Sequence, residues 1–392
     1  MTDDESPRGR CTPETAVLCA GAGGRRQDGS VGVRLDLEKA RPGNVVFGLS
    51  PLAELGAALH VLAEPEHHLV EAEWVANTRA VIEPELARRC TELSVLWGSY
   101  RLRLLFPLSL APSKALDDEL NAISELPLDD FVELTAFAVR GGNSGESLRS
   151  VATDVDLQAR VVDRARRRGR GAETVAEELF ADPEGFRRDF VQFLRDVGAV
   201  ALEPMWKQRS AALARDASAR RDLATAKGLV PALQSLSGSI GAGDSASSLV
   251  IDKIHHGLVD VARQPLLVVP TSFGWPHLLV KHERGMPAVL QYPVRADLRA
   301  DSTSLALLQL RLSVLADPMR LRVCRAVARE PRTTADLAEA WGISSSQVSR
   351  HLRALREAGL VTTMRNGRFV SYQLDATALA RLGADLIVAL LR

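Results

Sequence analysis

The stretch from Thr333 to Val361 reads TTADLAEAWGISSSQVSRHLRALREAGLV, and it decides the fold of the C-terminal part of the chain. Thr333 is followed three residues later by Asp336, which is the spacing of a capping box. This pair predicts the start of a short helix, and Gly342 predicts its end. A second helix that follows such a glycine turn at once would complete a helix-turn-helix.

The second helix is predicted over 344–358. Ser344 and Gln347 repeat the capping spacing at its start. Three apolar residues fall on one face at positions i, i+4 and i+7: Val348, Leu352 and Leu355. This face therefore belongs to a core, and the opposite face is left for solvent or a partner.

The opposite face of the 344–358 helix carries short polar side chains near its start and guanidinium groups further along. These residues are Ser345, Ser346, Gln347, Ser349, Arg350 and Arg353. A major groove admits such a helix, so that its early side chains meet base edges while Arg pairs with guanine or phosphate. We therefore interpret 344–358 as a recognition helix.

The segment 361–374 predicts a β-hairpin, because two alternating runs flank Asn366-Gly367, a strong turn signal. Arg365 and Arg368 lie beside this turn. A basic hairpin after a recognition helix is typical of a wing that contacts the DNA backbone. Arg365, Asn366 and Arg368 are therefore candidate DNA-binding residues.

Together these motifs resemble the winged helix-turn-helix of the ArsR/SmtB family of bacterial repressors. The resemblance covers about 75 residues, and it rests on four motifs: Leu315-Ala-Asp-Pro-Met-Arg-Leu, Val348-Ser-Arg-His-Leu-Arg-Ala-Leu, Ala358-Gly-Leu-Val and the Asn366-Gly367 wing. It implies a DNA-binding transcriptional regulator, with Ser345, Ser346, Ser349 and Arg350 at the DNA. The longer layout, with a motif like Pro270-Thr-Ser-Phe-Gly-Trp-Pro, is similar to long actinobacterial regulators whose front domain has no assigned function.

The charge distribution agrees with a DNA-binding domain at the C-terminal end of the chain. Lys plus Arg and Asp plus Glu both total 49 in the 392 residues, which gives a formal net charge of zero. Residues 301–392 nevertheless hold 13 Arg, no Lys and 8 acidic residues, a net charge of +5, and the first 300 residues carry −5. A basic C-terminal end is the electrostatic footprint of a protein that binds double-stranded DNA.

The fold class predicted for the whole chain is α+β and mainly α. Residues 1–30 predict a disordered tail, 31–300 a helical sensor or assembly domain, and 301–392 the winged helix. Helices are predicted after Ser50-Pro51 and over 69–82, 85–97, 115–125, 128–139, 153–167, 173–180, 183–197 and 200–226. Alternating residues from Val31 predict a strand that pairs with a small antiparallel sheet of strands at 249–254, 265–269, 278–280 and 288–292.

Two leucine stripes flank the winged core at helical spacing. They are Leu305, Leu308, Leu312 and Leu315 on one side and Leu379, Leu382, Leu386 and Leu390 on the other. Stripes of this kind on a domain of about 90 residues favour a homodimer, although they could pack on the front domain instead. A dimer predicts an inverted-repeat operator.

The sequence indicates no metal site and no cofactor. The predicted first helix, 333–341, has no Cys or His, and the last helix has Asp375 and Asp385 without a His. The pairs His67-His68 and His255-His256 are adjacent, and adjacent side chains seldom converge. Cys11, Cys19, Cys90 and Cys324 form no CxxC pair. The expected protein is therefore not metal-responsive.

The sequence contains no catalytic triad, nucleotide loop or metal set, so no enzyme is predicted. It also lacks a signal peptide and a membrane span, and a cytoplasmic protein is expected. A small-molecule effector would bind the front domain. The alternatives are an enzyme with a winged-helix appendage and a partner-binding protein whose winged helix docks protein.

Overall fold

The computed structural model describes residues 32–294 and 305–390. Short gaps within these ranges lie at 69–70, 99, 112, 114, 143–146, 254–255, 276 and 367–368. The predicted tail, 1–30, falls outside the described residues, and so do residues 295–304 between the two described ranges. We call 32–294 the front part and 305–390 the winged-helix part, and each is described by itself.

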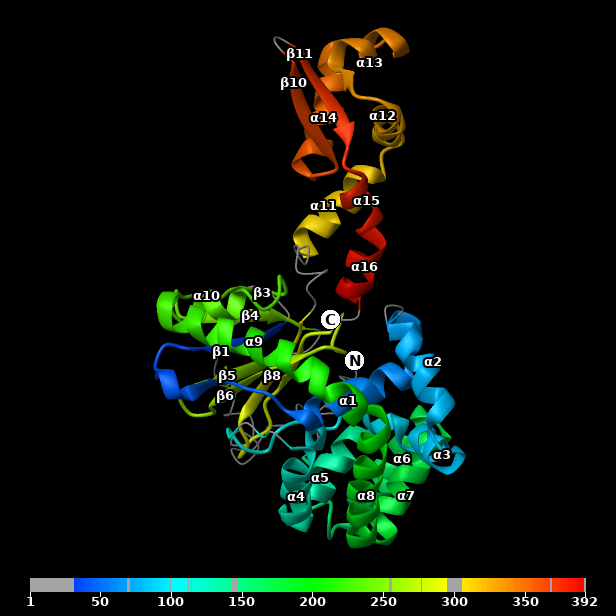
Figure 1. Ribbon diagram of the computed structural model, residues 1–392, viewed down its shortest axis with the longest axis vertical. Coiled ribbons are helices and arrows are strands. Elements are labelled where there is room, and N and C mark those ends of the chain that lie inside the picture. The colour runs from blue at the N-terminus through cyan, green and yellow to red at the C-terminus, as the bar shows by residue number, and fades with distance from the viewer. Residues whose placement is uncertain are drawn as a thin grey trace, which may run out of the picture. The chain divides into compact units, whose positions relative to one another are not determined.

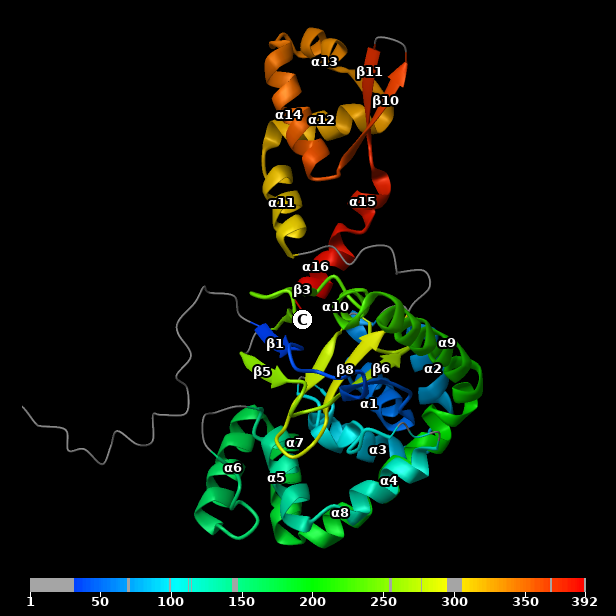
Figure 2. The ribbon, with the colours of Figure 1, turned by 90° about the vertical axis from the view of Figure 1, so that its left-hand side faces the viewer.

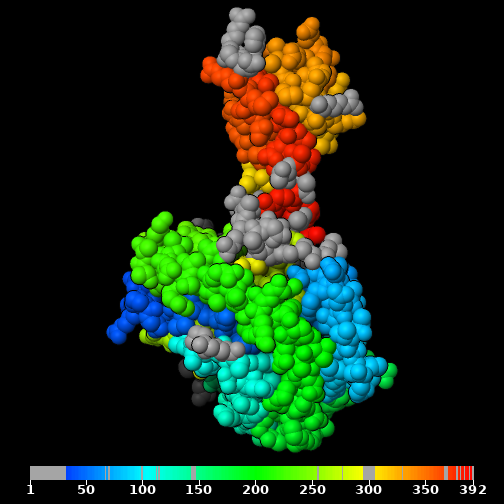
Figure 3. All heavy atoms as spheres, viewed as in Figure 1, coloured from blue at the N-terminus to red at the C-terminus, as the bar shows by residue number. Residues whose placement is uncertain are grey.

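The front part is mainly helical, as predicted. Its helices are α1 (Pro51–Ala63), α2 (Ala72–Val81), α3 (Pro84–Glu92), α4 (Leu116–Glu125), α5 (Leu128–Val139), α6 (Val155–Arg168), α7 (Arg170–Ala181), α8 (Pro183–Ala201), α9 (Glu203–Lys227) and α10 (Leu229–Gln234). Ser50 caps α1 by accepting a hydrogen bond from the backbone N–H of Ala53. Short α10 was not predicted. Figure 3 shows α8 and α9, in green, along one face of the front part.

The expected small antiparallel sheet is wrong in its orientation and extent. The strands are β1 (Gly32–Asp36), β2 (Val45–Phe47), β3 (Ile240–Ala242), β4 (Ser248–Asp252), β5 (Gly257–Asp260), β6 (Leu266–Thr271), β7 (Leu279–Lys281) and β8 (Ala288–Pro293). They form two mixed four-stranded sheets in the described residues, ordered β3-β4-β1-β5 and β2-β6-β8-β7. Strand β6 pairs in parallel with both β2 and β8. Strands β2, β3 and β5 are too short to show an alternating pattern.

The first strand closes the front part, as its alternation predicted. Strand β1 pairs antiparallel with β4, Val33 opposite Ile251, and parallel with β5 on its other edge. Val31 itself lies outside the described residues. Chain segments more than 200 residues apart are thus joined in one sheet.

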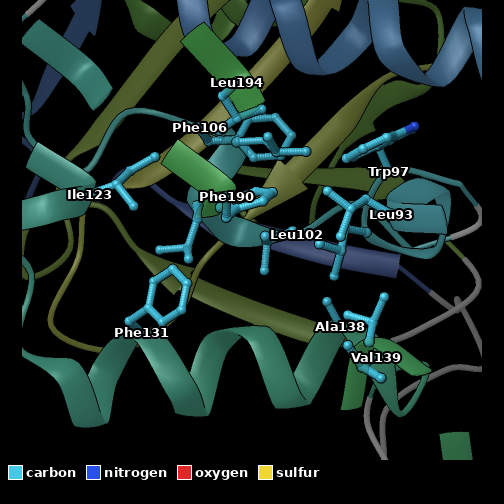
Figure 4. Close-up of a cluster of buried hydrophobic side chains, with 14 of the residues drawn as sticks. Leu93, Trp97, Leu102, Phe106, Ile123, Phe131, Ala138, Val139, Phe190 and Leu194 are labelled. Carbon is cyan, nitrogen blue, oxygen red and sulfur yellow. The ribbon is translucent and has the colours of Figure 1, made fainter. Parts of the chain in front are cut away.

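Strand β6 separates two cores. Leu266 and Val268 contribute to a cluster between the two sheets, whereas Leu267 and Val269 contribute to the cluster of the helices. Alternate residues of a strand point to opposite faces, so both faces of the second sheet are covered. Figure 4 shows the helical cluster, where Trp97, Phe106, Phe131 and Phe190 lie among aliphatic side chains. Figures 1 and 2 place helices α4–α8 together on one side of the strands.

The winged-helix part has a separate cluster of buried residues, which includes Val323, Leu337, Val348 and Leu352. Its elements are α11 (Leu305–Leu315), α12 (Pro318–Arg329), β9 (Arg332–Thr333), α13 (Thr334–Trp341), α14 (Ser345–Glu357), β10 (Val361–Asn366), β11 (Phe369–Leu374), α15 (Ala376–Ala380) and α16 (Leu382–Leu390). Helices α12 and α14 pack beside the β10–β11 hairpin (Figures 1 and 2). In the described part of the chain, no helix is long and apolar enough to cross a membrane.

Candidate nucleic-acid interface

The helix-turn-helix forms where the capping pairs predicted it. At the start of α13, Thr333 Oγ1 accepts a hydrogen bond from the Asp336 N–H, and an Asp336 carboxylate oxygen accepts one from the Thr333 N–H at 2.8 Å. Gly342 ends α13 with φ of +63°, a left-handed conformation that costs other residues free energy. The turn into α14 therefore depends on this glycine.

Helix α14 begins with the second predicted capping box. Ser344 Oγ accepts a hydrogen bond from the Gln347 N–H, and Gln347 Oε1 accepts one from the Ser344 N–H at 3.1 Å. The predicted apolar face is completely buried: Val348, Leu352 and Leu355. Burial of three large side chains fixes the rotation of α14 about its axis, and so determines which side chains face outward.

The structure brings the predicted recognition residues together on the outer face of α14. Ser345, Ser346, Gln347, Arg350 and Arg353 are exposed, and Ser349 is partly buried. Gln347 is also part of the capping box, so its amide oxygen is already engaged with Ser344. From Ser344 to Arg356 the helix carries no acidic residue. This face can donate hydrogen bonds and present positive charge to an anionic partner.

The predicted wing is a three-stranded sheet in the order β10-β11-β9. Strands β10 and β11 are antiparallel, with Val361 opposite Leu374 and Asn366 opposite Phe369. The third strand, β9, lies directly before α13 and so ties the hairpin to the helix-turn-helix. Arg365 is exposed on β10, and Asn366 ends that strand. Arg368 lies outside the described residues.

Arg311 links the end of α14 to both flanking helices. Arg311 on α11 donates from Nε to the carbonyl oxygen of Ala358 at 3.1 Å, directly after α14. Its guanidinium also pairs with Asp385 on α16 at 3.3 Å, with both side chains largely buried. The orientation of α14 is therefore coupled to α11 and α16. The sequence did not indicate this pairing, because the two residues are 74 positions apart.

In comparisons with known proteins, the front part and the winged-helix part match different family models. Residues 31–298 match a model described as a family of unknown function (DUF5937). The chain belongs to this family. In this DUF5937 protein, residues 315–363 match a second model, described as a helix-turn-helix domain.

The winged-helix part of the DUF5937 protein is of the ArsR/SmtB type. It is 42% identical over 82 residues to the HTH-type transcriptional regulator NmtR of Mycobacterium tuberculosis, covering 21% of this chain and 68% of that relative. It is 50% identical over 62 residues to a transcriptional repressor SmtB homolog of Synechocystis, covering 16% and 47%. The chain thus spans about half to two thirds of these relatives.

Among solved structures, the chain is similar to an ArsR-like transcriptional regulator from Rhodococcus, at 26% identity and a TM-score of 0.20. The alignment covers 21% of this chain and 76% of that one.

The structure also assembles residues that the sequence did not connect. His60, His68 and His277 lie close enough in the front part to hold a metal ion. The prediction of no metal site had weighed the adjacent histidine pairs, and His277 with His282 five residues later, but had not considered His60. These three residues share no local spacing, so only the fold could reveal them.

Proposed function

We propose that the DUF5937 protein is a DNA-binding transcriptional regulator, a repressor that reads DNA with α14. The observation that carries this proposal is the outer face of α14, which is exposed, polar and free of acidic residues over its first twelve positions. The opposite face is buried in the core of the winged-helix part. A helix mounted in this way can enter a major groove with its N-terminal side chains at the base edges.

Each candidate residue has a role that follows from its position. Ser345 and Ser346, in the first turn, would donate hydrogen bonds to phosphate or base edges. Arg350, one turn further along, would hold a guanine bidentately or pair with a phosphate. Arg353 is the next exposed guanidinium and would contact the backbone. The wing residues Arg365, Asn366 and Arg368 would reach the neighbouring phosphates or minor groove.

A homodimer is part of the proposal. Helix α11 exposes Leu305 and Leu312, and the last two helices expose Leu379 and Leu390. Leu308, in the same predicted stripe, is buried within the described structure instead. Exposed leucines on the two flanking helices supply a surface that a second copy would cover. Two α14 helices related by a dyad would then read an inverted repeat about one helical turn apart.

The front part would act as the sensor. A cavity of about 410 Å³ lies between α1, α2 and α3, with Leu59, Ile82, Cys90 and Trp97 in its wall. A mostly apolar cavity of this size suits a small organic effector. Burial raises the pKa of the Cys90 thiol to about 12, so this thiol stays protonated and a nucleophilic role is not proposed. We place the regulator in the cytoplasm, where it meets the chromosome.

Fluorescence anisotropy tests the DNA-binding proposal. The full chain is titrated onto a labelled duplex from its own upstream region and onto a scrambled duplex of the same composition. We expect a clear preference for the upstream duplex, and an affinity that falls linearly on a log–log plot against salt by about 0.9 per phosphate contact. Equal affinity for both duplexes at moderate salt contradicts sequence-specific regulation.

Arg350→Ala tests the residue assignment. If Arg350 reads a base, the substitution should cost about 1 to 3 kcal/mol of binding free energy on the preferred duplex. Arg188→Ala is the matched control, because Arg188 is a highly exposed arginine on α8 in the front part. An unchanged affinity of the Arg350→Ala variant removes this residue from the interface.

A further inference from the structure

Three histidines that are distant in the sequence meet inside the front part. His60 lies on α1, His68 follows a short turn after α1, and His277 lies between β6 and β7. One ring nitrogen can be taken from each so that all three atoms lie within 4.8 Å of one another. The ring centroids are 5.0, 4.9 and 5.3 Å apart. Imidazoles arranged in this way can share one small ion.

The hydrogen bonding of His60 fixes which of its ring nitrogens carries the proton. Its Nδ1 lies 2.9 Å from the carbonyl oxygen of Trp97. A carbonyl only accepts hydrogen bonds, so Nδ1 carries the proton and Nε2 keeps its lone pair. Metal-binding histidines usually donate their second N–H to a carbonyl or carboxylate in this way. The lone pair of His60 Nε2 therefore faces His277.

The separation of two of the three histidines is close to that of ligands around a tetrahedral ion. With metal–nitrogen bonds of about 2.0 to 2.1 Å, ligand nitrogens in a tetrahedral site lie roughly 3.3 Å apart. The Nε2 atoms of His60 and His277 are 3.1 Å apart and hydrogen-bonded, with His277 as the donor when Nδ1 of His60 carries its proton. An ion bound by both atoms would replace that proton, which is released to solvent. A ring nitrogen of His68 would need to move about 1 Å closer to the other two to become the third ligand.

The loop that carries His277 is anchored firmly to α1. The backbone N–H of Ser272 donates to the Glu54 carboxylate at 3.0 Å, and the Ser272 hydroxyl donates to the same group. The ring of Phe273 packs 4.4 Å from that of Trp74, and the Arg209 guanidinium lies over its face. These contacts hold the loop so that His277 reaches His60, which is the preorganisation that a binding site requires.

Two of the three histidines are almost completely buried. His60 and His68 are 3% and 1% exposed, and His277 is partly buried. Burial, followed by the nearby charge of Arg101, holds the pKa of His60 far below its ordinary value, so this imidazole is neutral. Arg101 opposes a dication electrostatically, and an anion in the fourth coordination position would offset that repulsion.

We propose that His60, His68 and His277 bind one Zn²⁺ ion and leave the fourth position of its tetrahedron open to a small ligand. Imidazole-only ligand sets suit zinc and its neighbours among the divalent transition metals. The site shares no residue with α14 and does not depend on the proposed DNA binding. It would fasten the end of α1 to the loop between β6 and β7.

Metal titration of the full chain tests the site. After dialysis against a chelator, the protein is titrated with Zn²⁺ in a competition assay with a chromophoric chelator. We expect one ion per chain and an affinity at least about tenfold lower in His68→Gln and in His277→Gln, because each loses a ligand. His256→Gln is the matched control, since His256 is an exposed histidine of the same part, and it should match the unaltered chain.

A second readout needs no variant. Co²⁺ bound to the unaltered chain should give the strong visible absorption of a four-coordinate site, and Zn²⁺ at about 100 times its Kd should stabilise the chain by about 2.7 kcal/mol. The proposal is overturned if the unaltered chain takes up no Zn²⁺ and shows no Co²⁺ band. It is equally overturned if His256→Gln weakens binding as much as the two cluster substitutions.

Discussion

In α14 the side chains offered to a partner all come from residues 345–353, whereas the histidine cluster joins His60 to a residue 217 positions away. The two regions also differ in their exposure to solvent. The outer face of α14 is exposed, and the cluster is largely buried. A local site of the first kind is encoded by spacing along one helix. A site of the second kind exists only after α1 and the β6–β7 loop have packed together.

The same contrast governs what stabilises each region. The winged-helix part depends on two capping boxes, one glycine turn and a small apolar cluster. The front part has larger clusters on both faces of its second sheet, and several of its ionisable groups are buried. A destabilising substitution in one region should therefore leave the unfolding of the other region unchanged.

The largest effect is expected from Leu352→Ala. Leu352 is completely buried in the core of the winged-helix part, and removal of such a side chain usually costs about 2 to 5 kcal/mol. Leu59→Ala is the matched substitution in the helical core of the front part. Calorimetry of the full chain should show that each substitution lowers a different unfolding transition. If either variant lowers both transitions, the two regions do not unfold independently.

Glu119→Gln should alter the pH dependence of the front part. The carboxylate of Glu119 accepts hydrogen bonds from Ser50 Oγ at 2.7 Å and from the Leu52 N–H at 2.8 Å, which ties α4 to the start of α1. Burial raises its pKa from 4.5 to about 7. The folded state therefore binds this proton more tightly than the unfolded state does. The resulting stabilisation by protonated Glu119 is complete below pH 4.5 and is lost as the pH rises through 7.

The comparison of this variant with the unaltered chain isolates that one group. Other buried carboxyls, such as Glu54, titrate in both proteins and cancel in the difference. Relative to the unaltered chain, the Glu119→Gln variant should gain up to about 3 kcal/mol of unfolding free energy between pH 4.5 and pH 8, at about 1.4 kcal/mol per unit of pKa. Denaturant unfolding of both proteins at several pH values measures this difference in unfolding free energy. A difference that stays flat with pH shows that Glu119 is not the titrating group.

These contrasts also explain how far the sequence could predict the structure. The capping pairs at Thr333 and Ser344, and the apolar face of α14, are local patterns, and the structure confirms them. Most helices of the front part were likewise predicted within a few residues. The parallel pairing of β6 with β2 and β8 was not predicted, because strand orientation depends on packing between distant segments. The histidine cluster was missed for the same reason.

The smallest effect is expected from Ser344→Ala, and it tests whether a local device acts locally. Loss of the cap on α14 should cost about 1 kcal/mol of stability, because the Gln347 N–H loses its side-chain acceptor and keeps only the Ser344 carbonyl oxygen at 3.0 Å. Asp154→Ala is matched, since Asp154 caps α6 in the front part by accepting from the Leu157 N–H at 2.9 Å. Both substitutions should lower stability by similar amounts in denaturant unfolding.

Only Ser344→Ala should also weaken DNA binding, because the cap at Ser344 orients the turn that carries Ser345 and Ser346. An equal loss of DNA affinity in both variants would mean that the front part controls α14, and the two regions could no longer be treated as independent.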